Sequence, residues 1–193
     1  MRAVLPTSSS LESSRTLQVV IECGMTPEQA TFLLHEILLP QIENEHKTTR
    51  RLLAALPSGK GEYKPHEKCM TAWELASHIV TSQIFFLEGI AAGKFERGAP
   101  LPESITTPEQ LLEWDEEHFA KAVAALKAVK GEDLVKELNF MNVFSWPAVT
   151  FAQLSGNHTI HHRGQLSSYI RPMGGKVPGI YGPSGDTAVP ATA

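Results

Sequence analysis

The 193-residue chain has few cysteines, no long apolar run and no strongly basic block. Its two cysteines, Cys23 and Cys69, lie far apart without a CxxC partner, which excludes a disulfide framework and a cysteine-rich zinc site. This usage suits a reducing compartment, and we expect a cytoplasmic protein. No stretch approaches the ~20 continuous apolar residues that span a bilayer. A net charge of −4 without a basic block argues against nucleic acid or an anionic membrane as partner.

Several catalytic motifs are also missing from the sequence. It contains no Gly-x-Ser-x-Gly elbow and no Walker or dinucleotide-type glycine loop, so serine hydrolase and nucleotide chemistry lack support. The His35-Glu36 pair does not begin an HExxH zinc-protease element, because Leu39 occupies the place of the second histidine. What remains is the composition of one well-cored globular domain, 42% hydrophobic and 20% charged.

The ends of the chain differ in composition from its middle. Residues 1–24 are serine-rich, and their short apolar run at 17–21 is too short for a signal-peptide core. Translation from either Met1 or Met25 is compatible with the sequence, since the first helix signal follows Met25 at once. The Gly/Pro-rich C-terminal end suggests a loose tail. We therefore expect a flexible N-terminal extension, one domain and a flexible C-terminal tail at residues 1–24, 25–182 and 183–193.

Helix start signals recur along the domain. Thr26, Thr71 and Thr107 each stand three residues before a Gln or Glu, which is the spacing of a capping box. Pro40 should kink the first helix or leave a short break. The segment at 138–144 could be extended. Four long helices predict an all-α fold, a four-helix bundle, with helices at about 26–56, 71–92 (ended by Gly93), 107–130 (ended by Gly131) and 147–171.

Three of the eight histidines lie within five residues of one another on the fourth predicted helix. His158 and His162 are at positions i and i+4, so their side chains share one face and could converge on one ion. His161 is ~100° around the axis from His162. We expect His161 to contact a backbone or carboxylate group rather than to share that ion.

A third ligand is needed, because a catalytic zinc usually takes three protein ligands and keeps one position open. His78 is the best candidate, since it lies in an otherwise apolar part of the second predicted helix. Either Glu74 or Gln165 could accept a hydrogen bond from one of the imidazoles and orient it. Such a site could activate a water or hold a substrate thiolate.

Three segments also resemble a known family: Ser77-His78-Ile79, the HxxHHRGQ run at 158–165, and the stretch at 171–182 with its Pro-Gly-Ile-Tyr-Gly end. Together they resemble the DinB-like (DinB/YfiT) superfamily over residues 25–182. The resemblance implies a four-helix bundle with up-down-down-up topology. It also implies a divalent metal (Zn, Ni, Fe or Mn) on His78, His158 and His162.

The resemblance further implies a function. Relatives include enzymes that transfer a low-molecular-weight thiol, a thiol-dependent isomerase and metal hydrolases, so we expect a metal-dependent transferase or hydrolase with a small-molecule substrate. Catalytic residues are not assigned. Arg163 is a candidate anion contact, with helix packing as its alternative, and Tyr181 could cover the site. The competing hypotheses are a non-catalytic metal or small-ligand binding protein of a stress response, and a structural module. We expect a homodimer.

Overall fold

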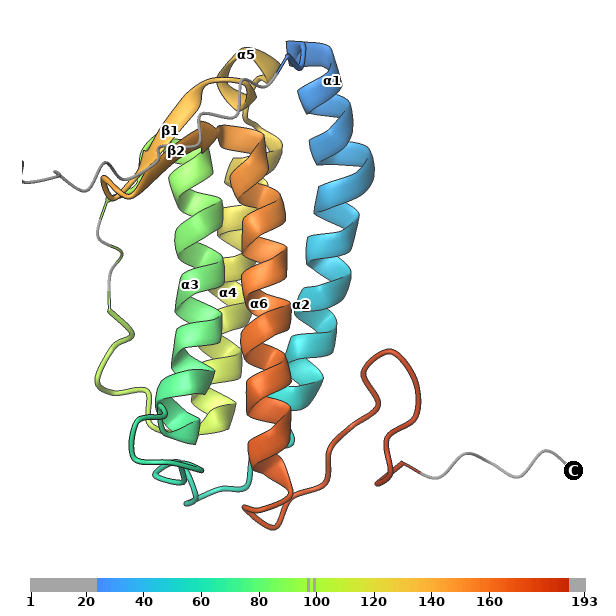
Figure 1. Ribbon diagram of the computed structural model, residues 1–193. Coiled ribbons are helices and arrows are strands. Elements are labelled where there is room, and N and C mark those ends of the chain that lie inside the picture. Colours follow the sequence, from blue (N-terminus) through green and yellow to red (C-terminus); the bar gives the residue numbers. More distant parts are fainter. Residues whose placement is uncertain (1–23, 97, 99, 188–193) are drawn as a thin grey trace, which may run out of the picture.

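The computed structural model describes residues 24–96, 98 and 100–187. Apart from Gly24, the predicted N-terminal extension lies outside the described residues, as does the end of the C-terminal tail at 188–193. The described chain is mostly helical and includes one two-stranded sheet (Figure 1). Its elements in order are α1 (Pro27–Phe32), the π-helix η1 (Leu33–Leu38), α2 (Leu39–Leu53), α3 (Ala72–Ala92), α4 (Pro108–Lys127), α5 (Gly131–Leu134), β1 (Glu137–Phe140), β2 (Phe144–Pro147) and α6 (Ala148–Ile170).

The helix starts are set by the predicted threonines. Each threonine side chain accepts a hydrogen bond from a backbone N–H of the first turn, and the side chain three residues later reaches back to the threonine N–H. Two orphan donors are satisfied at each start, which fixes the first turn. The predicted capping boxes are confirmed for α1, α3 and α4, where the pairs are Thr26–Gln29, Thr71–Glu74 and Thr107–Gln110.

Pro40 changes the helix type without breaking the helix. The turn before it, η1, is a π-helix, and the N–H of Leu39 bonds to the carbonyl of Leu34, five residues back. Proline has no N–H and its ring crowds the preceding turn, so a wider turn accommodates it. α1, η1 and α2 therefore form one continuous helical rod (Figure 1).

The segment after α4 differs from the prediction that the third helix runs to about Lys130. α4 ends at Lys127, and Gly131 begins α5 instead of ending the longer helix. A Cβ on Gly131 would lie 2.5 Å from the carbonyl oxygen of Pro27, so close packing against α1 requires glycine there. The expected extended segment is the antiparallel hairpin β1–β2, whose turn places Met141 and Asn142 at positive φ.

α3 is the central helix. It packs against both α4 and α6, and α2 lies on the far side of α6 and also touches α4 (Figure 1). By length and composition alone α3 could cross a membrane, but 56% of the apolar window is buried inside the protein. α3 and α4 begin at the same end of the molecule, while α2 and α6 end there (Figure 1). The long α3–α6 contact positions the histidines.

Candidate metal centre

The contact between α3 and α6 brings three histidines together. His78 of α3 faces His158 and His162, which lie one turn apart on α6, and ring centroids are separated by 4.4 to 5.0 Å. One ring nitrogen of each residue lies within 4.8 Å of the other two, and all three residues are half-buried. Three imidazoles in this arrangement could hold one metal ion.

The closest pair of nitrogens has the separation expected of two ligands on one ion. Nε2 of His78 and Nε2 of His162 are 3.3 Å apart. Two nitrogens at ~2.05 Å from a tetrahedral zinc would be about 3.3 Å apart. The geometry of this pair therefore fits a shared metal ion without moving either helix.

The electrostatics of the cluster favour neutral rings. Burial, together with the neighbouring His162, His78 and His161, lowers the pKa of His158 from its ordinary 6.5 to about 4. Burial and His162 also lower the pKa of His78. Metal ligands must be deprotonated, so both rings are ready to bind at neutral pH. Nδ1 of His158 is buried and has no hydrogen-bond partner within the described chain, so it is a polar atom that a bound ligand could satisfy.

One of the two predicted orienting groups contacts a ring. Oε1 of Gln165 is 2.6 Å from Nδ1 of His162, so that nitrogen carries the proton and Nε2 keeps its lone pair toward the other histidines. Glu74 is exposed and accepts the N–H of Thr71 at 2.7 Å, which lowers the pKa of its carboxyl group. Glu74 thus serves the start of α3, and Gln165 is the residue positioned to orient a ligand.

The predicted substrate contact at Arg163 does not fit the structure. Arg163 is only 2% exposed, and its guanidinium lies 2.6 Å from Oε2 of Glu45 on α2. Tyr181 accepts from Arg163 at 2.5 Å and donates to Glu45 at 2.9 Å. Adjacent helix residues point ~100° apart, so Arg163 faces α2 while His162 faces α3. Arg163 and Tyr181 tie α6 and the C-terminal segment to α2, and the buried Arg163 points away from the histidines.

The sequence also predicts that His161 contacts a backbone or carboxylate group. His161 is exposed, with its ring centroid 4.8 Å from that of His162, and its expected backbone or carboxylate partner is not found in the described part of the chain.

In the predicted C-terminal tail, Asp186 accepts from Arg171 and from the N–H of Val177. These contacts extend the packed chain beyond the boundary predicted at residue 182.

A cleft of about 900 Å³ lies along α3 beside the histidines. On the helix side it is lined by His78, by the adjacent Ser77, and by Thr81 and Ser82, which lie three and four residues further along α3. Residues of the loop before α4 also line it, among them Gly98, Leu101, Glu103 and Ile105. The sequence places Ser82 on the same helix face as His78, whereas it gives no signal for the loop that completes the cleft. The cleft gives a small molecule access to the histidine at its wall.

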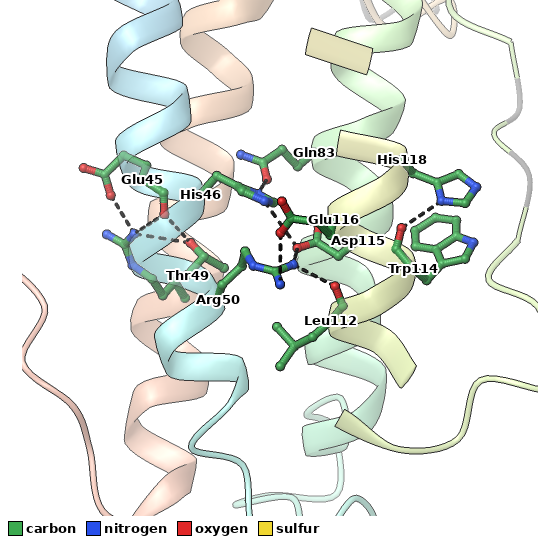
Figure 2. A network of polar contacts seen from close by, with 11 residues as sticks. Glu45, His46, Thr49, Arg50, Gln83, Leu112, Trp114, Asp115, Glu116 and His118 are labelled. Atoms are coloured by element: carbon green, nitrogen blue, oxygen red, sulfur yellow. Dashed lines mark hydrogen bonds and ion pairs between the residues drawn. The ribbon is translucent and has the colours of Figure 1, made fainter. Parts of the chain in front are cut away.

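Another group of polar side chains, around His46 and Asp115, links α2, α3 and α4 (Figure 2). His46 is stacked on Phe119 with ring centroids 3.4 Å apart, and its Nδ1 is 3.0 Å from Oε1 of Gln83. Asp115, which is 1% exposed, accepts from Arg50 at 2.9 Å. Burial raises the pKa of Asp115 and lowers that of His46. The buried carboxylate is thus neutralised inside the protein, which indicates a structural role.

Comparisons with known proteins point to one family. The model of the DinB family matches residues 28–188. The "Uncharacterized protein YjoA" of Bacillus subtilis (strain 168) is 31% identical over 133 residues, covering 68% of this chain and 85% of that protein. The crystal structure of YjoA, a DinB-like protein, superposes with a TM-score of 0.59 and 28% identity over 71% of this chain and 92% of that chain. A DinB-like protein from Bacillus cereus ATCC 10987 gives a TM-score of 0.64 and 27% identity over 76% and 97%.

Proposed function

Because this chain belongs to the DinB family, we propose that it is a metal-dependent enzyme with one divalent ion on His78, His158 and His162. One observation carries the proposal: three imidazoles from two helices converge, burial lowers the pKa of two of them, and His78 lines an open cleft. With three protein ligands, the ion keeps a coordination position for water or substrate. Zinc, nickel, iron and manganese all accept imidazole ligands.

We also propose a helix topology, a cellular location, an oligomeric state and a class of partner. The four long helical rods form a bundle of the family's up-down-down-up type, which is supported by the common end at which α3 and α4 begin. The proposed setting is a cytoplasmic homodimer that acts on a small molecule and not on nucleic acid or a membrane. The acidic net charge of −4 supports the last part of this proposal.

The proposed chemistry is thiol transfer or hydrolysis. A bound divalent ion would supply Lewis-acid activation of a thiolate or a water. The chain's own residues hold and orient: Gln165 fixes the Nδ1 proton of His162, and the cleft admits the substrate beside His78. A low-molecular-weight thiol is the proposed cosubstrate for the transferase reaction.

A second candidate function is a non-catalytic metal or small-ligand binding protein. It is favoured by the side chains near the histidines on the cleft wall. Ser77, Thr81 and Ser82 are hydroxyls, and the nearby carboxylate of Glu74 is engaged at the helix start. On the α3 wall of the cleft, therefore, no free carboxylate stands beside His78 within the described chain.

A substrate screen separates the two candidates. Protein loaded with zinc, nickel or manganese would be assayed for conjugation of cysteine or glutathione to 1-chloro-2,4-dinitrobenzene, and for hydrolysis of p-nitrophenyl acetate. We expect activity in wild type and in His161→Ala, which alters an exposed neighbour, and loss in His162→Ala at unchanged helicity. Equal rates in wild type and His162→Ala, with metal bound to wild type, would overturn the enzyme and leave the binding protein.

A further inference from the structure

A second cavity lies at the end of the molecule where α2 ends and α3 and α4 begin. Its volume is about 350 Å³, within the range of small-molecule pockets. Most of its walls are apolar, and Glu62 is the single charged residue among the described lining. The apolar walls come from three helix ends and the segment after α6, and include Leu56, Pro57, Ala72, Trp73, Pro108 and Met173. Such a lining favours an uncharged aliphatic or aromatic group.

The cavity adjoins the metal cleft. Trp73 and Thr106 line both spaces, so they form the boundary between the two. Trp73 precedes His78 by five residues on α3, which corresponds to a rise of about 7.5 Å along the helix. A molecule bound to the histidines at one end would need a spacer of roughly 8 Å to place its other end past Trp73.

The wall between the two spaces is held in place by the backbone. The N–H of Trp73 bonds to the carbonyl of Gly61 at 2.9 Å, and the N–H of Ala72 bonds to the carbonyl of Tyr63 at 2.8 Å. A Cβ on Gly61 would lie 3.1 Å from Cβ of Trp73, so glycine lets this loop approach the helix closely. The cavity is therefore formed before any ligand binds, which reduces the ordering that binding requires.

We propose that the cavity lined by Trp73, Ala72 and Met173 takes the apolar tail of a substrate whose head group binds the histidines. The substrate class is an amphipathic small molecule, with a thiol or other metal-binding head and an uncharged tail. This inference rests on the proposed metal site and adds the part of the substrate that the metal does not recognise.

A series of n-alkanethiols tests the proposal on the full-length, zinc-loaded protein. Ethanethiol through octanethiol would be titrated by calorimetry. Affinity should rise about fourfold for each methylene that enters the cavity, from the ~0.8 kcal/mol of a buried methylene, and this rise is expected in the longest members of the series. Shorter members, whose chains do not pass Trp73, should bind with similar affinities.

Two matched variants localise the effect. Thr106→Phe places a ring at the boundary between the two spaces, whereas Ser104→Phe adds the same ring to an exposed loop position outside both linings. We expect Thr106→Phe to abolish the chain-length dependence while ethanethiol still binds, and Ser104→Phe to behave as wild type. Affinity that is independent of chain length in zinc-loaded wild type, or a dependence that Thr106→Phe leaves unchanged, would overturn the tail site alone. Failure to retain zinc would overturn the metal site, and the inference with it.

Discussion

Consecutive residues of α6 belong to two polar clusters with opposite properties. Arg163 is buried, and each of its contacts is to a group of the protein itself: the carboxylate and carbonyl of Glu45, and the hydroxyls of Thr49 and Tyr181. His162 is half-buried and faces two further imidazoles whose pKa values are lowered. We call the group around Arg163 the closed cluster and the three histidines the open cluster. Figure 2 shows Glu45 and Thr49 of the closed cluster on α2. In the closed cluster the carboxylate of Glu45 neutralises the charge of Arg163. In the open cluster the histidine rings keep nitrogen lone pairs that a metal ion could use.

This difference distinguishes buried polar groups that stabilise the fold from polar groups that can bind a ligand. A buried ion pair whose members satisfy each other holds elements together and needs no ligand. In the histidine cluster, burial holds the rings of His78 and His158 neutral, and each neutral ring keeps one nitrogen lone pair that can bind a metal ion. The same helix therefore anchors the fold through one residue and presents a ligand set through its neighbour.

The largest expected effect comes from breaking the closed cluster. Glu45→Ala should lower the free energy of unfolding by about 3–5 kcal/mol, because the buried guanidinium of Arg163 loses its partner. Tyr181→Phe removes one hydroxyl and keeps the ion pair, so a loss of about 1 kcal/mol is expected. Urea unfolding measures both. Metal content per folded chain should not change, and a folded Glu45→Ala protein that has lost the metal would contradict the separation of the clusters.

Lower pH should affect the open cluster in the metal-free protein. The unfolded chain binds a proton at His158 near its ordinary pKa of 6.5, but the folded chain does so only near 4. The unfolded state thus holds more protons between these values, so the free energy of unfolding falls as the pH drops from 6.5 to 4. His78 has a shift of the same sign, also caused by burial first.

Urea unfolding at pH 7.5 and pH 5 measures this dependence, with His158→Gln as the comparison because it does not titrate. The variant should lose less stability than wild type between the two pH values. Equal losses in both proteins would show that His158 is not held neutral by the fold.

A smaller effect is expected from the orienting residue. Gln165→Ala should weaken metal affinity by about 10- to 100-fold, since His162 loses the acceptor that fixes its Nδ1 proton. Stability without metal should stay close to wild type, because Gln165 is exposed. Gln165→Glu keeps an acceptor and serves as the control in a metal titration. An alanine variant with wild-type affinity would remove Gln165 from the site.

Much of the fold followed from local signals in the sequence. The three threonine caps and Gly93, which has a φ of 70°, set helix ends by contacts within a few residues. Gly131 was assigned the wrong role, because its reason is the approach of α1 from more than 100 residues away. Local patterns cannot reveal a constraint that exists only after the chain has packed.

The candidate site was also predicted only in part from local sequence patterns. The spacing of His158 and His162 predicts a shared face, and the place of His78 in an apolar helix, together with the resemblance to the family, pointed to the third ligand. The direction of Arg163 depended on which helix α6 meets on each side, and its partner Glu45 is 118 residues away. Adjacent positions in the sequence therefore suggested a common site, whereas the helix turn of ~100° separates them.

Elemental metal analysis of untagged protein tests the central claim most directly. We predict about one divalent ion per chain in wild type and in His161→Ala, and loss of the ion in His162→Ala with its helicity preserved. The three proteins differ only at two neighbouring histidines, one inside the cluster and one exposed beside it. Wild-type protein that binds no metal after incubation with zinc, nickel and manganese, or a His162→Ala variant that keeps its ion, would contradict the metal centre.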